Sequence, residues 1–299
     1  MFSQVKRPIR IRILRIAIVL VAVAAAAYAL ILVGASQAYV WVLVHSPCVH
    51  SQSTPAGFQP VELTNENGAA LLGWFKPPEE NIDAAVVLLG GQGASRDTML
   101  PEAEMLAQHG YSVLSIDYRT CAGETGTLGY AEVGDLQSGV EFLKRQAGVV
   151  HVGVLGFSVG GITAIRGAAR LPEIEAVVAM GGYSNLADQV LATPAGAFST
   201  RWTVQRLVLV LFQLQTGVAP GQISPISDLP AIAPRPVLLI FGANELVRAQ
   251  GQAQFDAARD PKELWVVPGV GHGGYYQALP DEFEQRVTAF FAQMGLKAG

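Results

Sequence analysis

The sequence predicts an α/β fold, with a mostly parallel sheet covered by helices on both faces and one N-terminal transmembrane helix ahead of it. Three observations support this prediction. The 299-residue chain is 51% hydrophobic and only 15% charged, whereas soluble domains carry about 25% charged residues. Its first 44 residues hold five basic side chains and then a long uncharged apolar run. Farther on, short apolar runs alternate with helical stretches, which is typical of a parallel sheet buried on both faces.

Composition and charge exclude several classes of protein. The apolar excess is unlike that of disordered, collagen-like or coiled-coil chains. The net charge is −4, and beyond the five N-terminal basic residues 15 basic side chains face 24 acidic ones, a net of −9, which disfavours a nucleic-acid partner. Two cysteines are too few for a disulfide framework or a four-cysteine zinc site. No His/Asp cluster has ligand spacing, so we expect no metal and no cofactor.

The N-terminal region is expected to hold the chain at a membrane. Residues 1–15 form a basic tip, and residues 16–44 contain no Asp, Glu, Lys or Arg. Since roughly 20 apolar helical residues cross a bilayer core, 16–44 are predicted to be a transmembrane helix or signal anchor, with Tyr39 and Trp41 as aromatic anchors. The basic flank predicts a single-pass cell-membrane protein with a cytoplasmic N-terminus and an extracytoplasmic body.

Two other interpretations of this segment stay open. Ser36-Gln37-Ala38 offers the small residues of a signal-peptide cleavage site, although the apolar run exceeds the roughly 7–15 residues of a signal core. A buried core helix is the other, and the long absence of charge disfavours it. Residues 45–60 are rich in Ser, Pro, Gln and Gly and are expected to tether the membrane helix to the body at 61–299.

The body is expected to alternate strands with helices. The predicted strands cover 61–64, 71–75, 84–89, 112–116, 149–155, 176–180, 236–241 and 263–267, the first two paired around a turn. The predicted helices cover 99–108, 134–145, 160–170 and 281–293. Residues from about 183 to 228 are less regular and are expected to form a cap. Its apolar stretch 201–214 is interpreted as a helix packed on the domain or as a surface that dips into the bilayer to collect lipid-like substrate.

Ser158 is the predicted nucleophile. It lies in Gly156-Phe157-Ser158-Val159-Gly160, a Gly-x-Ser-x-Gly pattern between an apolar strand and a helix. Glycines two before and two after the serine allow a tight strand-to-helix turn that projects the hydroxyl from the sheet. The pentapeptide also occurs by chance in Gly-rich turns with a solvent-facing serine. The flanking strand and helix favour the nucleophile, because that context is the test of the motif.

A serine nucleophile needs a base and an acid to orient the base. His272 is the only histidine after Ser158 and follows the predicted strand 263–267 in a glycine-rich loop, so it is the predicted general base. Glu245 is the only acid in the loop after strand 236–241 and is the predicted orienting carboxylate, with Asp188 as the reserve. The alternative interpretation is that His272 and Glu245 are ordinary surface residues without a catalytic role.

Acyl transfer also needs donors for the oxyanion that forms on the carbonyl. The turn Leu89-Gly90-Gly91-Gln92-Gly93 follows the third strand of the body. We expect one backbone N–H from Gln92 and another from Val159, the residue after the nucleophile. A phosphate-binding loop is the rival interpretation, but the Gly-Lys-Ser/Thr ending and the strand-linked Gly-x-Gly-x-x-Gly pattern are both missing.

These motifs resemble those of the α/β-hydrolase superfamily of serine hydrolases, over about residues 60–296. The chain order Ser158, Glu245, His272 is the order of that family's triad, and Asp117-Tyr118-Arg119 resembles its Asp-Tyr-Arg-Gly segment. The membrane-tethered and dienelactone-hydrolase or peptidase-like branches are the most similar. The chain departs from the family pattern at three places. Gly90-Gly91 stands where His-Gly is usual, Thr120–Gly123 stands where a glycine-rich loop is usual, and Phe241 replaces a frequent histidine.

The resemblance implies an α/β-hydrolase fold and a membrane-anchored serine hydrolase of an ester, thioester or amide, acting on a small-molecule or lipid acyl substrate. Dehalogenase and epoxide hydrolase relatives carry aspartate where this chain has Ser158. Two alternatives stay open: a binding or scaffold protein that has lost the chemistry, and an acyltransferase that uses the same triad. Cys48 and Cys121 can pair if the body is extracytoplasmic, and the sequence leaves this pairing and the oligomeric state open.

Overall fold

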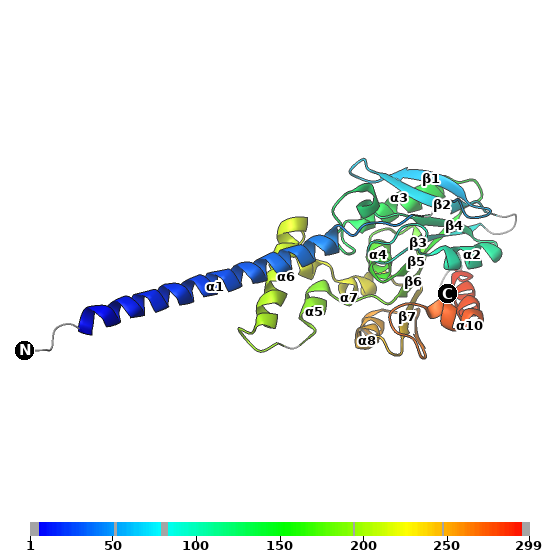
Figure 1. Cartoon of the computed structure of the whole chain (residues 1–299). Coiled ribbons are helices and arrows are strands. Elements are labelled where there is room, and N and C mark those ends of the chain that lie inside the picture. The colour runs from blue at the N-terminus through cyan, green and yellow to red at the C-terminus, as the bar shows by residue number, and fades with distance from the viewer. Residues whose placement is uncertain (1–5, 51–52, 79–82, 194, 247, 295–299) are drawn as a thin grey trace, which may run out of the picture.

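The structure is a computed structural model that describes residues 6–50, 53–78, 83–193, 195–246 and 248–294. Residues 1–5 of the expected basic tip, 51–52 of the expected tether, and 79–82, 194, 247 and 295–299 of the expected body lie outside the described residues. A long helix projects from an α/β body, with the N-terminus at its far end (Figure 1).

The projecting helix, α1 (Lys6–Val44), is longer than the predicted segment at 16–44. It starts inside the expected basic tip, because Pro8 lies in its first turn, where a missing N–H costs no helical hydrogen bond. Its stretch 11–44 is long and apolar enough to cross a membrane. Side chains 11–31 are exposed, which argues against the buried core helix considered from the sequence.

The body is built on one eight-stranded sheet, in the order β1-β2-β4-β3-β5-β6-β7-β8. β1 pairs with β2 and β2 with β4 in antiparallel fashion, and all other pairs are parallel, which confirms the predicted mostly parallel sheet. The strands are β1 Gln59–Thr64, β2 Ala70–Lys76, β3 Ala84–Leu89, β4 Ser112–Ile116, β5 His151–Phe157, β6 Ile174–Met180, β7 Val237–Gly242 and β8 Lys262–Val267.

Helices cover both faces of this sheet because its central strands are apolar on both sides. Every residue of β3 is buried. One face packs against α3 (Glu132–Lys144), α4 (Val159–Ala168) and α8 (Arg248–Ala257). The other packs against α2 (Leu100–Gln108) and α10 (Pro280–Phe291). The sequence analysis predicted no helix at α8, since this mostly polar segment lacks a clear apolar period.

The segment predicted as a cap holds the helices α5 (Leu186–Leu191), α6 (Thr200–Thr216) and α7 (Pro225–Asp228). α6 lies beside the C-terminal half of α1 (Figure 1). Val40 and Val44 of α1 share a buried cluster with Val208 and Phe212 of α6. The stretch 201–214 is therefore a packed helix, and its packing partner includes the apolar N-terminal helix.

A disulfide joins Cys48, in the tether, to Cys121, in the 3-10 turn η1 (Arg119–Ala122) after β4. Their Cα atoms lie 5.2 Å apart. The bond fixes the chain just beyond α1 to a loop at the edge of the sheet where the parallel strands end. The pairing that the sequence left open is thus present in the structure.

Candidate active site

Ser158 lies at the tight turn between β5 and α4. Its φ of +56° is in the left-handed region, a costly conformation for a residue with a side chain, of the kind that clusters at functional sites. The flanking glycines make this turn possible: a Cβ on Gly160 would overlap the carbonyl oxygen of Leu89, and one on Gly156 would overlap the carbonyl of Gly160. The turn presents the hydroxyl beyond the end of β5, as the motif predicts.

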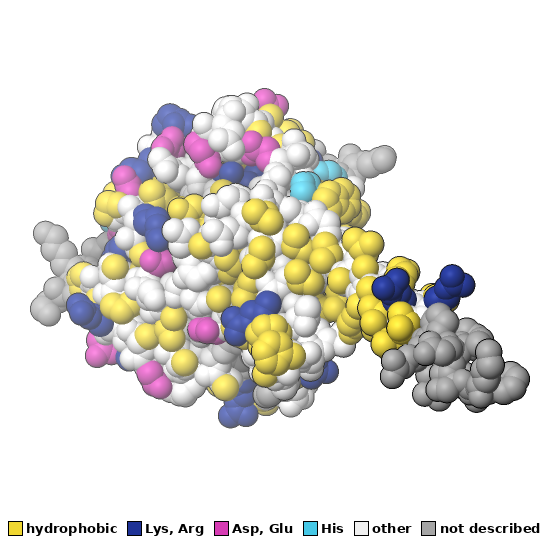
Figure 2. All heavy atoms as spheres, turned by 90° about the vertical axis from the view of Figure 1, so that its left-hand side faces the viewer, with side chains coloured by type: hydrophobic (Ala, Val, Ile, Leu, Met, Phe, Trp, Pro, Cys, Tyr) yellow, Lys and Arg dark blue, Asp and Glu magenta, His cyan; other side chains and the backbone are white. Residues whose placement is uncertain are grey.

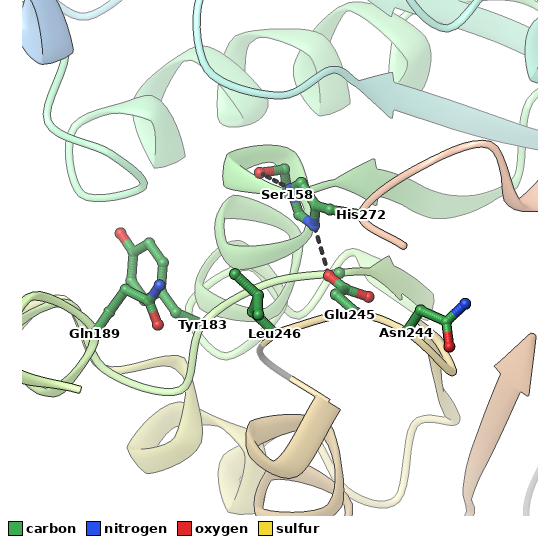
Figure 3. A pocket seen from close by; sticks show the side chains of 8 residues that line it. Ser158, Tyr183, Gln189, Asn244, Glu245, Leu246 and His272 are labelled. Atoms are coloured by element: carbon green, nitrogen blue, oxygen red, sulfur yellow. Dashed lines mark hydrogen bonds and ion pairs between the residues drawn. The ribbon is translucent and has the colours of Figure 1, made fainter. Parts of the chain in front are cut away.

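His272 connects Ser158 to Glu245 (Figure 3). Its Nε2 lies 2.9 Å from Ser158 Oγ, and its Nδ1 lies 2.5 Å from Glu245 Oε1. The imidazole rests on the ring of Phe157, with ring centroids 4.8 Å apart. The structure therefore brings together the three side chains that the sequence selected, from loops separated by 27 residues for Glu245 and His272 and by 114 for Ser158 and His272.

Glu245 is held by two further donors. Its Oε2 accepts hydrogen bonds from the backbone N–H of Gly242 and from the hydroxyl of Tyr275, both at 2.9 Å. The Glu245 side chain is only 1% exposed, against 47% for His272. Both donors bind Oε2, so Oε1 is directed at the imidazole. Asp188, the reserve acid, is exposed on α5 and does not contact His272.

Tyr275 was missed by the sequence analysis, although it follows His272 by three residues. Burial, and then the charge of Glu245, raise the pKa of its phenol far above the usual value. The hydroxyl therefore stays protonated and remains a donor to the carboxylate. No local pattern marks this role, because it depends on where α9 (Tyr275–Ala278) packs.

Gly181, directly after β6, leaves the space that the triad occupies. Its φ is +59°, and an added Cβ would overlap the Tyr275 hydroxyl while lying 2.8 Å from Glu245 Oε1 and 3.1 Å from His272 Nδ1. A larger residue at this position would push apart the groups that hold the imidazole.

The two predicted oxyanion donors lie near the nucleophile. Gln92, Val159 and Ser158 border one cavity, and neither the Gln92 nor the Val159 N–H donates to a protein acceptor among the described residues. The Gln92 side chain reaches the end of the N-terminal helix: its Nε2 donates to the carbonyl of Leu43 at 2.8 Å and to Ser46 Oγ at 3.0 Å. This contact with α1 had no signal in the sequence.

Two cavities meet at Ser158. The smaller, about 440 Å³, is lined by Gly181, Tyr183, Gln189, Asn244, Glu245, Leu246 and His272 (Figure 3). The larger, about 580 Å³, extends to α1, α5 and α6. Tyr183 borders both cavities, and its hydroxyl donates to the carbonyl of Leu128 at 2.6 Å. Ser158 therefore has space on two sides for the parts of a bound ligand.

One group of potential metal ligands occurs among the described residues, formed by His50, Asp117 and Cys121. The Cys121 sulfur is already bonded to Cys48, and Asp117 accepts from the backbone N–H and from the guanidinium of Arg96. A disulfide sulfur is no thiolate ligand, so this group does not suit a metal ion.

Comparisons with known proteins identify the family. Uncharacterized protein MT2364 of Mycobacterium tuberculosis is 29% identical over 229 residues, covering 74% of each chain. Uncharacterized protein YfhR of Escherichia coli O157:H7 is 23% identical over 232 residues, 73% of this chain and 74% of YfhR. The Pyrococcus furiosus esterase Pf2001 superposes with a TM-score of 0.67 at 28% identity, over 84% of this chain and 99% of the esterase. The sequence model described as "Alpha/beta hydrolase family" matches residues 86–286, and the chain belongs to that family.

Proposed function

We propose that this protein is a membrane-anchored serine hydrolase that cleaves a carboxylic ester, thioester or amide through an acyl-enzyme on Ser158. The observation that carries the proposal is the hydrogen-bonded row Ser158–His272–Glu245, at 2.9 and 2.5 Å. This arrangement activates a hydroxyl and stabilises the imidazolium that forms when the hydroxyl loses its proton.

In the acylation step, Ser158 Oγ attacks the carbonyl carbon of the substrate while His272 Nε2 takes the hydroxyl proton. The carbonyl oxygen becomes an oxyanion that accepts from the N–H groups of Gln92 and Val159. Collapse of this intermediate breaks the bond to the leaving group, which receives the proton from His272. The acyl group stays on Ser158, and the alcohol, thiol or amine departs.

In the deacylation step, water gives its proton to His272 and adds to the acyl carbon. The second oxyanion collapses, the bond to Ser158 Oγ breaks, and the proton returns to the serine. The carboxylic acid leaves and the free enzyme is restored. Glu245 orients the imidazole throughout, because the Gly242 and Tyr275 donors hold its Oε2 while Oε1 stays on His272.

The proposed placement has α1 in the membrane, the N-terminus in the cytoplasm, and residues 61–299 as a catalytic domain outside it, with a cap at about 183–228. The basic residues that precede the apolar run support this orientation. The Cys48–Cys121 disulfide supports it as well, since such bonds persist in oxidising compartments. The esterase Pf2001, similar in structure, supports an ester as the first substrate class to test.

The test is labelling of the purified full-length chain by a fluorophosphonate, which reacts with an activated serine. We expect the wild type and Ser138→Ala, a variant remote from the site on α3, to be labelled, and Ser158→Ala to be unlabelled. Equal labelling of Ser158→Ala would overturn the proposal. An unlabelled wild type would favour a fold without this chemistry. When an alcohol is added during turnover, free acid as the main product supports hydrolysis, whereas a new ester would indicate transfer.

A further inference from the structure

The N-terminal helix changes its surroundings partway along its length. Side chains 11–31 are exposed, whereas Leu32, Ser36, Val40 and Val44, spaced by four residues, are partly or fully buried against the body. Four-residue spacing places these side chains on one helix face. The C-terminal end of α1 therefore packs against the body, and the turns before it are free to cross a bilayer.

With α1 placed in the membrane as proposed above, the start of α6 lies at the level of the leaflet nearest the body. A span of roughly 20 residues that begins after Arg15 ends near Ala35. The Tyr28 hydroxyl lies 2.5 Å from Thr200 Oγ1, at the start of α6, and Tyr28 precedes Ala35 by about 10 Å of helix. That depth matches the roughly 5–10 Å by which interfacial helices enter a leaflet. Phe198, just before α6, is 87% exposed.

The larger cavity runs from this region to the nucleophile. At the α6 end it is lined by Thr193, Arg201, Val204 and Val208, along α1 by Tyr39 and Leu43, and at its inner end by Gln92, Val159 and Ser158. Viewed from the side from which α1 projects, hydrophobic side chains form a broad area beside α1, and most acidic side chains lie toward the periphery (Figure 2). The end of α1 that follows the proposed bilayer span thus forms one wall of the cavity that contains the predicted oxyanion donors.

We propose that the substrate is a long-chain acyl ester of a membrane lipid. Its acyl chain leaves the leaflet nearest the catalytic domain between α1 and α6 and lies in the 580 Å³ cavity, and its carbonyl carbon rests at Ser158. The alcohol part then lies in the smaller cavity beside His272. This inference rests on the proposed hydrolase activity and names its substrate class. Arg201, at the start of α6, is exposed, and a long basic side chain of this kind keeps its charged head in water while its stem lies along an apolar surface.

The experiment compares p-nitrophenyl palmitate with p-nitrophenyl butyrate in detergent micelles, using the full-length chain. Val204→Trp narrows the cavity and is expected to lower the palmitate-to-butyrate ratio of kcat/KM at least ten-fold. Val210→Trp is the matched control, because Val210 is on the same helix, 56% exposed and outside the cavity lining; its ratio is expected to stay within two-fold of the wild type. Leu43→Trp obstructs the cavity from α1 and is expected to act like Val204→Trp.

Labelling by a short-chain fluorophosphonate reports whether each variant keeps its fold and its nucleophile. If Val204→Trp is not labelled, the lipid inference is tested by Leu43→Trp and by the chain-length preference of the wild type. A wild type that prefers butyrate, or labelled obstructed variants with an unchanged ratio, would overturn the lipid inference and leave the hydrolase proposal intact. A wild type that is unlabelled and cleaves neither ester would instead overturn the proposed function. In vesicles of phosphatidylcholine and phosphatidylglycerol, we expect the wild type to release fatty acid and Ser158→Ala to release none.

Discussion

The two cavities that meet at Ser158 are built from different parts of the molecule. The smaller is walled mainly by residues in the loops after parallel strands, including Gly181 after β6 and Glu245 after β7, and α5 contributes only Gln189. The larger is walled mainly by helices, α1 from the N-terminus and α5 and α6 from the cap. The position of the reacting groups is therefore set by the hydrogen-bonded sheet. The shape of the larger cavity depends instead on how the helices pack on that sheet.

The largest expected effect on activity comes from a substitution in the smaller cavity, at Glu245. Glu245→Gln keeps the size of the side chain but loses its charge, so the imidazole loses its orienting acceptor and the imidazolium its stabilisation. We expect kcat to fall by roughly 10³–10⁴-fold, measured by steady-state kinetics on a short-chain ester. Asp188→Asn, which alters the exposed acid of α5, is expected to stay within two-fold. A Glu245→Gln enzyme with a tenth of wild-type activity would show that the carboxylate is dispensable.

Gly181→Ala tests whether the sheet side tolerates a small displacement. The added Cβ would push Tyr275, Glu245 and His272 apart, and a misplacement of about 1 Å can cost about 10²-fold in rate. The control is Gly217→Ala at the end of α6, which also has a positive φ, of +72°, but whose Cβ would meet no atom within 4 Å. We expect Gly217→Ala to lower the free energy of unfolding by about 1 kcal/mol with kcat/KM unchanged. Equal activities of the two variants would contradict the crowding argument.

Tyr275→Phe removes one donor from Glu245 and leaves the ring in place. We expect kcat to fall about ten-fold with little change in KM, because a hydrogen bond worth about 1.5–3 kcal/mol no longer holds the carboxylate in the position that orients the imidazole. A carboxylate with one donor fewer binds the imidazolium more strongly, so the acid limb of the kcat/KM profile should move to higher pH. Tyr276→Phe is the neighbouring control, because that ring packs on Phe283. An unmoved acid limb would argue that Tyr275 acts only through packing.

The smallest effect on activity is expected on the helix side, from loss of the disulfide. The double variant Cys48→Ala/Cys121→Ala opens a covalent loop of sequence separation 73, which should lower the free energy of unfolding by about 2–4 kcal/mol. Activity should change only a few-fold, because the hydrogen bonds from Gln92 to Leu43 and Ser46 remain. Thermal unfolding with and without reductant gives the measurement. A wild-type Tm that is the same with and without reductant would contradict a structural role for the disulfide.

The features that the sequence analysis predicted are marked by patterns that lie close together in the sequence. The alternation of apolar runs predicted the mostly parallel sheet, and the Gly-x-Ser-x-Gly turn selected Ser158 from ten residues of context. Uniqueness selected the other two, because His272 is the only histidine after Ser158 and Glu245 is the only acid in the loop after strand 236–241. The helix α1 begins ten residues before the predicted membrane segment 16–44, because basic side chains are as compatible with a helix as apolar ones.

What the sequence by itself determined is therefore the fold class, the apolar N-terminal segment and the three residues that meet at the end of the sheet. Local periodicity encodes the first two, turn chemistry marks Ser158, and scarcity of their residue types marks His272 and Glu245. Only the tertiary structure decided that Tyr275 supports Glu245, that Gly181 makes room for both, and that Tyr28 meets Thr200 across 172 positions of chain. Such contacts join segments whose local patterns are independent of one another. They form because buried apolar faces, here those of α1 and α6, lose contact with water only when the whole domain assembles.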